Sequence, residues 1–171
     1  ERLTANFASY LQNHTDLNVG DRIAIQLPNV LQFPIAAMGA MRAGMVVVNT
    51  NPLYTAREME HQFNDSGAKA LVILANMANM AEQVVPKTGI KLVMVTQLAD
   101  MHPFAKRVLI NTVVKRVKKM VPAYSLPDAV SFRQTLALGA KKAPVAVSLT
   151  LADTAVLQYT GGTTGVSKGA Q

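Results

Sequence analysis

Short apolar segments alternate with segments of helical periodicity along most of the chain, and this alternation constrains the fold more than any other feature. Strands are predicted where apolar and β-branched residues cluster, at 22–27, 45–48, 69–74, 92–95 and 155–159. Helices are predicted at 3–11, 31–43, 55–67, 77–85, 104–121 and 131–140. Such alternation is typical of βαβ units. The sequence therefore predicts an α/β fold with a mostly parallel sheet flanked by helices.

The alternation is interrupted between about 101 and 150, where three prolines punctuate loops around the last two predicted helices. We therefore expect three parts. Residues 1–100 form an α/β subdomain, residues 101–150 hold a basic amphipathic helix and a connecting insertion, and residues 151–171 hold a strand and a Gly/Thr-rich loop. Thr55 and Glu58 have the spacing of a helix capping box, which predicts a helix start at that point.

Composition excludes several classes of protein. Half of the residues are hydrophobic and 16% are charged, which is incompatible with intrinsic disorder. The absence of cysteine excludes disulfides and thiol nucleophiles. No apolar run reaches the roughly 18 residues of a membrane-spanning helix. The three histidines lack metal-binding spacing, so no metal site is predicted in this chain. Because the chain begins at Glu1 and stops just after the Gly/Thr-rich stretch, we expect it to be a piece of a longer protein.

The stretch from Thr160 to Lys168 carries the clearest chemical signal. Its three glycines allow backbone N–H groups to point at an anion, two threonines follow, and Lys168 adds a positive charge. It is not a Walker A motif, because no Gly-Lys-Ser/Thr stands at the required spacing. The residues alone leave two alternatives open, a phosphate-binding loop and an ordinary flexible turn.

The string from Tyr159 to Gly169 resembles the signature of the adenylate-forming superfamily, and further blocks at 20–29, 43–58 and 65–69 resemble the same family. The Gly-Gly form of the loop and the basic stretch 103–122 most resemble bacterial long-chain fatty-acyl-CoA synthetases. The resemblance implies part of the large N-terminal domain of such an enzyme. It also implies an ATP-binding segment composed of Tyr159, Thr160, Gly161, Gly162, Thr163, Thr164, Gly165, Val166, Ser167, Lys168 and Gly169.

Such enzymes join a fatty acid to ATP as acyl-AMP and pass the acyl group to coenzyme A, so the resemblance implies ATP and Mg²⁺, with fatty acid and coenzyme A as substrates. The family's catalytic residues, including its acidic Mg²⁺ contact, are expected beyond Gln171. The chain alone is therefore expected to be inactive. Two alternatives remain: another adenylate-forming acid–CoA ligase with a medium-chain or aryl substrate, and a non-catalytic membrane- or protein-interaction module.

The net charge of +7 is concentrated in one segment. Six of the 17 basic residues lie between Met101 and Pro127, which contains no acidic residue. The predicted helix 104–121 has an apolar face and a cationic face, so it either packs on this domain or lies on a membrane surface. Nucleic acid is disfavoured because no aromatic residues interleave with the charges. The residues expected at a membrane surface are Arg107, Lys115, Arg116, Lys118 and Lys119. The expected location is the cytoplasm, peripherally on the inner membrane, and a homodimer is compatible with the resemblance.

Overall fold

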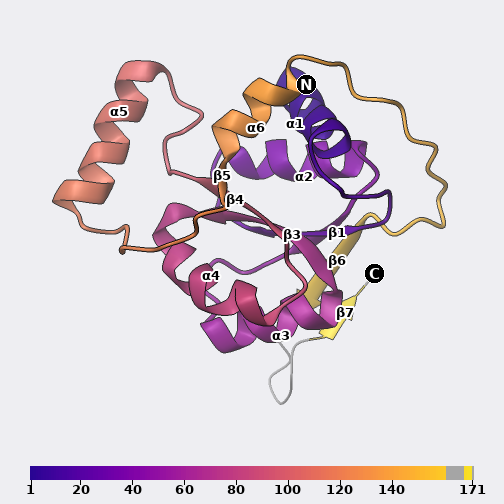
Figure 1. The fold of residues 1–171 in the computed structure, drawn as a ribbon, viewed down its shortest axis with the longest axis horizontal. Helices are drawn as coiled ribbons and strands as arrows, with labels where there is room; N and C mark the ends of the chain where they lie inside the picture. The colour runs from indigo at the N-terminus through magenta and orange to yellow at the C-terminus, as the bar shows by residue number, and fades with distance from the viewer. Residues whose placement is uncertain (161–167, 171) are drawn as a thin grey trace.

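A sheet of seven strands runs through the middle of the molecule (Figure 1). The computed structural model describes residues 1–160 and 168–170. In the sheet order β5-β4-β3-β1-β2-β6-β7, every neighbouring pair is parallel except β6–β7, which is antiparallel. The α/β prediction with a mostly parallel sheet is therefore confirmed. The strands are β1 (Arg22–Gln26), β2 (Val46–Asn49), β3 (Ala68–Leu74), β4 (Leu92–Thr96), β5 (Val130–Ser131), β6 (Val156–Thr160) and β7 (Lys168–Ala170).

Helices cover both faces of the sheet. Helices α1, α2 and α6 lie on one face, and α3 and α4 lie on the other (Figure 1). Parallel crossovers are almost always right-handed, so connections that run in opposite directions along the sheet place their helices on opposite faces. This explains why α2, between β1 and β2, and α3, between β2 and β3, are separated by the sheet. The helices are α1 (Arg2–Asn13), α2 (Gln32–Arg42), α3 (Ala56–Ser66), α4 (Ala78–Val84), α5 (Phe104–Thr112) and α6 (Phe132–Gly139), with short turns η1 (Ala75–Met77), η2 (Val85–Lys87) and η3 (Val113–Val117).

Each face of the sheet has its own apolar core. On the first face, Phe7 of α1 packs against Phe132 of α6 with ring centroids 5.0 Å apart, and both side chains are fully buried. On the second face, Met59 and Phe63 of α3 are fully buried against the sheet. Burying an aromatic or methionine side chain contributes roughly 1.5–3 kcal/mol, so these two clusters hold the helices to the sheet.

Local sequence signals set the ends of several elements. The predicted capping box is present, because Glu58 N donates to Thr55 Oγ1 and Thr55 N donates to Glu58 Oε2. Helix α3 then ends at Gly67, whose φ of 62° is easily adopted only by glycine. The five predicted strands are present, and β5 and β7 were not predicted. β5 has only two residues and β7 contains a lysine and a glycine, so neither shows a strand pattern of its own.

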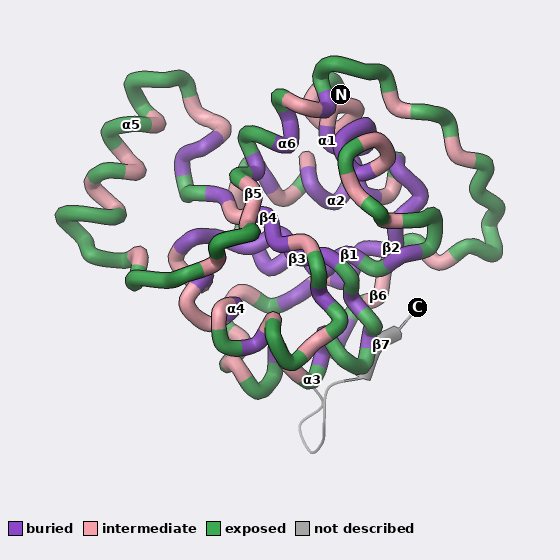
Figure 2. Tube along the Cα trace, viewed as in Figure 1, coloured by how far each residue is buried: buried purple, intermediate pink, exposed green. Residues whose placement is uncertain are grey.

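The basic amphipathic helix differs from the prediction in length and in packing. The α-helix ends at Thr112 and is followed by the π-helical turn η3. Residues 118–121 are not helical, and Lys119 has a φ of 50°. No residue of α5 or η3 is buried (Figure 2). Leu109 is 64% exposed and Val117 is 69% exposed. Ile110, Val113 and Val114 of the same apolar face are half-buried, so in the described part of the chain this face is only partly covered by the domain.

Within residues 1–160 and 168–170, no helix combines the length and the apolar character needed to cross a bilayer. The division into 1–100, 101–150 and 151–171 stays a prediction.

Candidate functional site

A crevice of about 560 Å³ opens at the carboxyl ends of β1, β2 and β6. After β1 the chain turns to the face of α2, and after β2 it turns to the face of α3, so the two connections diverge and leave space between them. In open α/β sheets, ligands bind outside the carboxyl ends of the strands at such a point of divergence. The residues lining the crevice are Leu27, Pro28, Asn29, Phe33, Asn49, Thr50, Asn51, Pro52, Tyr54, Gln158 and Tyr159.

Side-chain amides fix the segment that follows β2, which forms one wall of this crevice. The buried Gln26 donates from Nε2 to the carbonyl of Asn51 at 3.3 Å. Gln62 of α3 donates to the carbonyl of Asn49 at 3.1 Å, and Asn49 Nδ2 donates to Gln158 Oε1 at 2.8 Å. These hydrogen bonds attach the segment after β2 to β1, to α3 and to β6, so three elements fix this wall of the crevice.

Tyr159 is held at the point where β6 approaches the Gly/Thr-rich stretch. Its hydroxyl donates to Asp65 Oδ2 at 2.5 Å, and its side chain is 7% exposed. Burial, together with the hydrogen bond to the Asp65 carboxylate, raises the pKa of the Tyr159 phenol well above its usual value. The phenol therefore stays protonated over the physiological range and remains the donor. This contact ties the end of α3 to the strand that leads into the predicted phosphate-binding segment.

The structure places only part of the predicted ATP-binding segment. Tyr159 lines the crevice, and Thr160 pairs with Lys168 across the antiparallel β6–β7 ladder, with Tyr159 paired to Gly169. The backbones of Thr160 and Lys168 thus lie opposite each other, next to Tyr159 of the crevice. The predicted residues Gly161, Gly162, Thr163, Thr164, Gly165, Val166 and Ser167 lie outside the described residues.

The crevice offers neutral hydrogen-bonding groups and no charge among its lining residues in the described part of the chain. Its volume is that of a small-molecule site, and its amides and hydroxyls suit a polar ligand. A phosphate group would need positive charge as well, for which Lys168 is the predicted source. Among the described residues, no cluster of three or more His, Cys, Asp or Glu side chains could hold a metal ion.

Sequence reasoning missed the amide groups that build the crevice and the carboxylate that holds Tyr159. Asn49 and Asn51 directly follow an apolar strand, and polar residues at the carboxyl ends of parallel strands meet at one edge of the sheet. That rule could have found them. Asp65 gives no such signal, because its contact with Tyr159 spans 94 residues of sequence.

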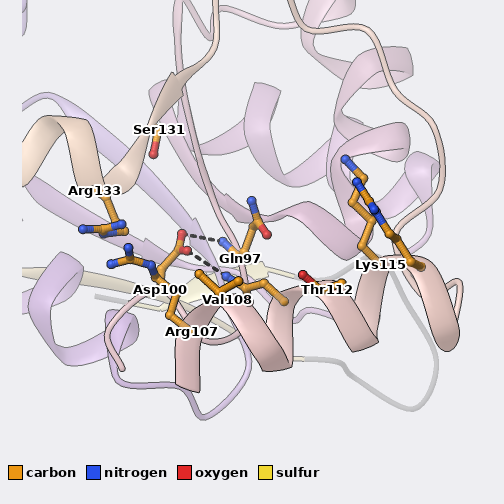
Figure 3. A pocket seen from close by; sticks show the side chains of 10 residues that line it. Gln97, Asp100, Arg107, Val108, Thr112, Lys115, Ser131 and Arg133 are labelled. Atoms are coloured by element: carbon orange, nitrogen blue, oxygen red, sulfur yellow. Dashed lines mark hydrogen bonds between the residues drawn. The ribbon is translucent and has the colours of Figure 1, made fainter. Parts of the chain in front are cut away.

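The basic residues predicted for a membrane surface separate into two groups. Arg107, Lys115 and Arg116 line a second cleft, between α5–η3 and the start of α6 (Figure 3). Lys118 and Lys119 follow η3, are exposed, and do not line that cleft.

The fold and the crevice define an α/β protein with a candidate ligand site at the carboxyl edge of its sheet. The AMP-binding enzyme family profile matches residues 1–171. The chain belongs to the AMP-binding enzyme family.

Similar proteins agree with this assignment. The chain is 53% identical over 170 residues to the long-chain-fatty-acid–CoA ligase of Escherichia coli O157:H7, covering 99% of this chain and 30% of that protein. The chain thus spans about 30% of the length of that relative. Two solved structures share the fold. A long-chain-fatty-acid–CoA ligase from Archaeoglobus fulgidus matches with a TM-score of 0.71 and 24% identity, over 98% of this chain and 28% of that one. ATP-bound MatB from Rhodopseudomonas palustris matches with a TM-score of 0.67 and 22% identity, over 99% and 28%.

Proposed function

We propose that the full-length protein containing this chain is an ATP-dependent long-chain fatty acid–CoA ligase. The observation that carries the proposal is the position of Thr160 and Lys168. They stand opposite each other beside the crevice at the carboxyl ends of β1, β2 and β6. Membership of the AMP-binding family and 53% identity to a bacterial long-chain ligase support the substrate class.

The proposed reaction has two steps. A fatty-acid carboxylate oxygen attacks the α-phosphorus of ATP, and the bond from that phosphorus to pyrophosphate breaks. The thiol of coenzyme A then loses its proton and attacks the acyl carbon, and the bond from that carbon to AMP breaks. Mg²⁺ is expected to neutralise phosphate charge. The resemblance to the adenylate-forming family implies that its acidic protein contact lies beyond Gln171.

The residues of this chain would act mainly in the first step. Negative charge develops on the departing pyrophosphate, and N–H groups and an ammonium group held ready for it lower the barrier. The segment from Thr160 to Lys168 would supply those groups. The Tyr159–Asp65 hydrogen bond would keep the end of β6 in place, so the segment starts from a fixed point.

The activity of the isolated chain gives a first prediction. Adenylation requires carboxylate, ATP and metal held together, and this chain supplies only part of that site. With oleate, ATP, Mg²⁺ and coenzyme A, we expect the full-length protein to release pyrophosphate and form oleoyl-CoA, and the 171-residue chain to do neither. Octanoate and benzoate serve as comparison acids. Faster turnover with either one would assign the protein to a medium-chain or aryl ligase, and normal turnover by the chain alone would contradict the account.

A second proposed property is contact with an anionic membrane surface through α5 and η3, at the cytoplasmic side. The observation that favours it is that this cationic helix exposes its apolar residues Leu109 and Val117 to solvent. Cations above apolar side chains are typical of helices that lie in a membrane interface. A non-catalytic protein-interaction role for the same face, and a homodimer, stay predictions.

Vesicle binding tests the membrane contact. Each Lys or Arg near an anionic leaflet contributes about 1 kcal/mol, so Lys118→Gln and Lys119→Gln should each weaken binding to phosphatidylglycerol vesicles by roughly fivefold. Leu109→Asn should weaken it as well, through loss of apolar insertion. Arg57→Gln, at an exposed residue of α3, is the matched control and should leave binding unchanged. Equal affinity for phosphatidylglycerol and phosphatidylcholine vesicles would contradict the proposal.

A further inference from the structure

A second cleft, of about 380 Å³, lies at the β5 edge of the sheet, between α5–η3 on one side and β5–α6 on the other (Figure 3). In the sheet order, β4, β3, β1 and β2 separate β5 from β6, so this cleft lies far along the sheet from the crevice beside Thr160 and Lys168. It is therefore a different site. The residues lining it are Gln97, Asp100, Arg107, Val108, Asn111, Thr112, Lys115, Arg116, Ser131 and Arg133.

Four cationic side chains from three elements face this cleft. Arg107 belongs to α5, Lys115 and Arg116 belong to η3, and Arg133 belongs to α6. None of the four forms an ion pair within residues 1–160. The guanidinium group of Arg107 lies 5.2 Å from the centre of the Phe104 ring. Cationic residues of separate elements thus line one cleft, with Arg107 and Arg133 at one end and Lys115 at the other (Figure 3).

Asp100 is the one carboxylate that lines the cleft, and its oxygens already have partners. Oδ2 accepts hydrogen bonds from the Gln97 backbone N–H at 2.8 Å and from Thr96 Oγ1 at 3.0 Å. Oδ1 accepts a hydrogen bond from Asn111 Nδ2 at 3.2 Å. Asp100 is 8% exposed, so it acts as a tie between β4 and α5. It is not within 4.0 Å of a cationic nitrogen, and Figure 3 shows its carboxylate directed at Gln97 and α5.

Neutral donors accompany these cations. Ser131 and Thr112 contribute hydroxyl groups to the lining, and Arg107 and Arg133 lie at the same end of the cleft as Asp100 (Figure 3). The same two arginines also line an adjoining cavity of about 310 Å³ on the side of α1. Guanidinium groups bind phosphate oxygens through two parallel N–H bonds, which gives Arg its preference for this ligand.

We propose that this cleft binds a phosphate group, either of a small phosphorylated solute or of an anionic phospholipid headgroup. Arg107 and Arg133 hold the phosphate oxygens, Lys115 and Arg116 supply further positive charge, and Ser131 donates a hydroxyl. This site does not take part in adenylation, and its existence does not depend on the proposed ligase activity.

Arg133 is the decisive residue for the test. It lies on α6, outside the amphipathic helix, so membrane binding by that helix alone predicts no effect of its replacement. It is exposed and forms no ion pair with the described residues, so Arg133→Gln should leave the fold unchanged, as circular dichroism would verify. Lys141→Gln, just after α6 and outside the cleft, is the matched control.

The experiment uses the full-length protein with its adenylation site filled by a non-hydrolysable ATP analogue and Mg²⁺. One arm titrates inorganic phosphate by calorimetry, and the other measures binding to phosphatidylglycerol vesicles. We expect Arg133→Gln to weaken binding in at least one arm by about tenfold, the effect of losing a charged hydrogen bond, and Lys141→Gln to weaken neither. Loss in the first arm identifies a soluble phosphate as a ligand, and loss in the second alone identifies the lipid headgroup. No effect of Arg133→Gln in either arm, or an equal effect of Lys141→Gln, would overturn the proposal.

Discussion

Replacing Lys168 by alanine in the full-length protein is expected to slow acyl-adenylate formation by about 10²–10³-fold. Lys168 pairs with Thr160 at the base of the predicted phosphate-binding segment, beside a crevice whose described lining carries no charge of its own. We therefore expect Lys168 to supply positive charge that stabilises the departing pyrophosphate. Thr164→Ala should act in the same direction, through the loss of a hydroxyl donor.

The rate of acyl transfer from preformed acyl-AMP to coenzyme A distinguishes a role in pyrophosphate departure from a general loss of activity. Pyrophosphate has already left at that stage, so both variants should slow transfer much less than they slow adenylation. Single-turnover mixing measures the two half-reactions separately, with circular dichroism as a check on folding. Lys141→Ala, far from the segment in sequence, is a control that should alter neither rate. Equal slowing of both half-reactions, or of neither, would contradict the assignment of the segment to phosphate binding.

The second large effect is expected at Gly139, where α6 approaches α1. A Cβ added to Gly139 would lie 1.8 Å from the carbonyl oxygen of Asn6 and 2.8 Å from the backbone nitrogen of Tyr10. Both atoms belong to the backbone of α1, so neither can move without displacing that helix. Overpacking of this kind usually costs about 1–3 kcal/mol and sometimes more. We therefore expect Gly139→Ala to lower the free energy of unfolding by at least that amount.

Urea unfolding of the chain provides the measurement, and a second glycine provides the control. A Cβ at Gly89 would meet only the carbonyl oxygen of Ala68, at an ordinary 3.7 Å, so Gly89→Ala should be neutral or slightly stabilising. For a protein of this size, a loss of 1 kcal/mol lowers the Tm by about 2–4 °C. If Gly139→Ala is as stable as Gly89→Ala, α1 and α6 do not approach each other as closely as the structure places them.

The sequence predicts the main parallel sheet because that sheet follows from local patterns. Apolar runs such as Leu71–Leu74 are buried on both faces, and Thr55, Glu58 and Gly67 mark the two ends of one helix by their side-chain and backbone chemistry. The edge strands β5 and β7 could not be predicted in this way. Each is a strand only because a neighbouring strand supplies hydrogen-bonding partners. Val130–Ser131 pairs with β4, more than 30 residues earlier in the sequence, and Lys168–Ala170 pairs antiparallel with β6.

The basic helix shows where periodicity misleads. Apolar positions continue at helical spacing to Val121, yet the α-helix ends at Thr112 and a π-helical turn follows. No residue of η3 is buried against another element. The carbonyl of Met120 accepts a hydrogen bond from Asn76 Nδ2 at 2.9 Å. Periodicity reports which side chains share a face. It does not report whether another element covers that face.

The candidate site was predicted in part. The predicted site residue Tyr159 lines the crevice, but its partner Asp65 and the Asn49–Gln158 pair depend on contacts between segments far apart in the sequence. The second cleft depends on such contacts as well. Arg133 joins Arg107 there because β5, which directly precedes α6, pairs with β4, which leads into α5. The distribution of charge along the sequence identifies the basic segment, but it does not show that Arg133 of α6 lies beside it.

Exchange of labelled pyrophosphate into ATP tests the central claim, that this chain supplies the phosphate-binding part of an acid-adenylating site. The full-length protein is mixed with ATP, Mg²⁺ and labelled pyrophosphate, with and without oleate, in the absence of coenzyme A. The account predicts oleate-dependent appearance of label in ATP, because acyl-AMP and pyrophosphate form reversibly before any thiol is needed, and loss of that exchange in the Lys168→Ala variant. Absence of oleate-dependent exchange in the wild-type protein, or full exchange in the Lys168→Ala variant, would contradict it.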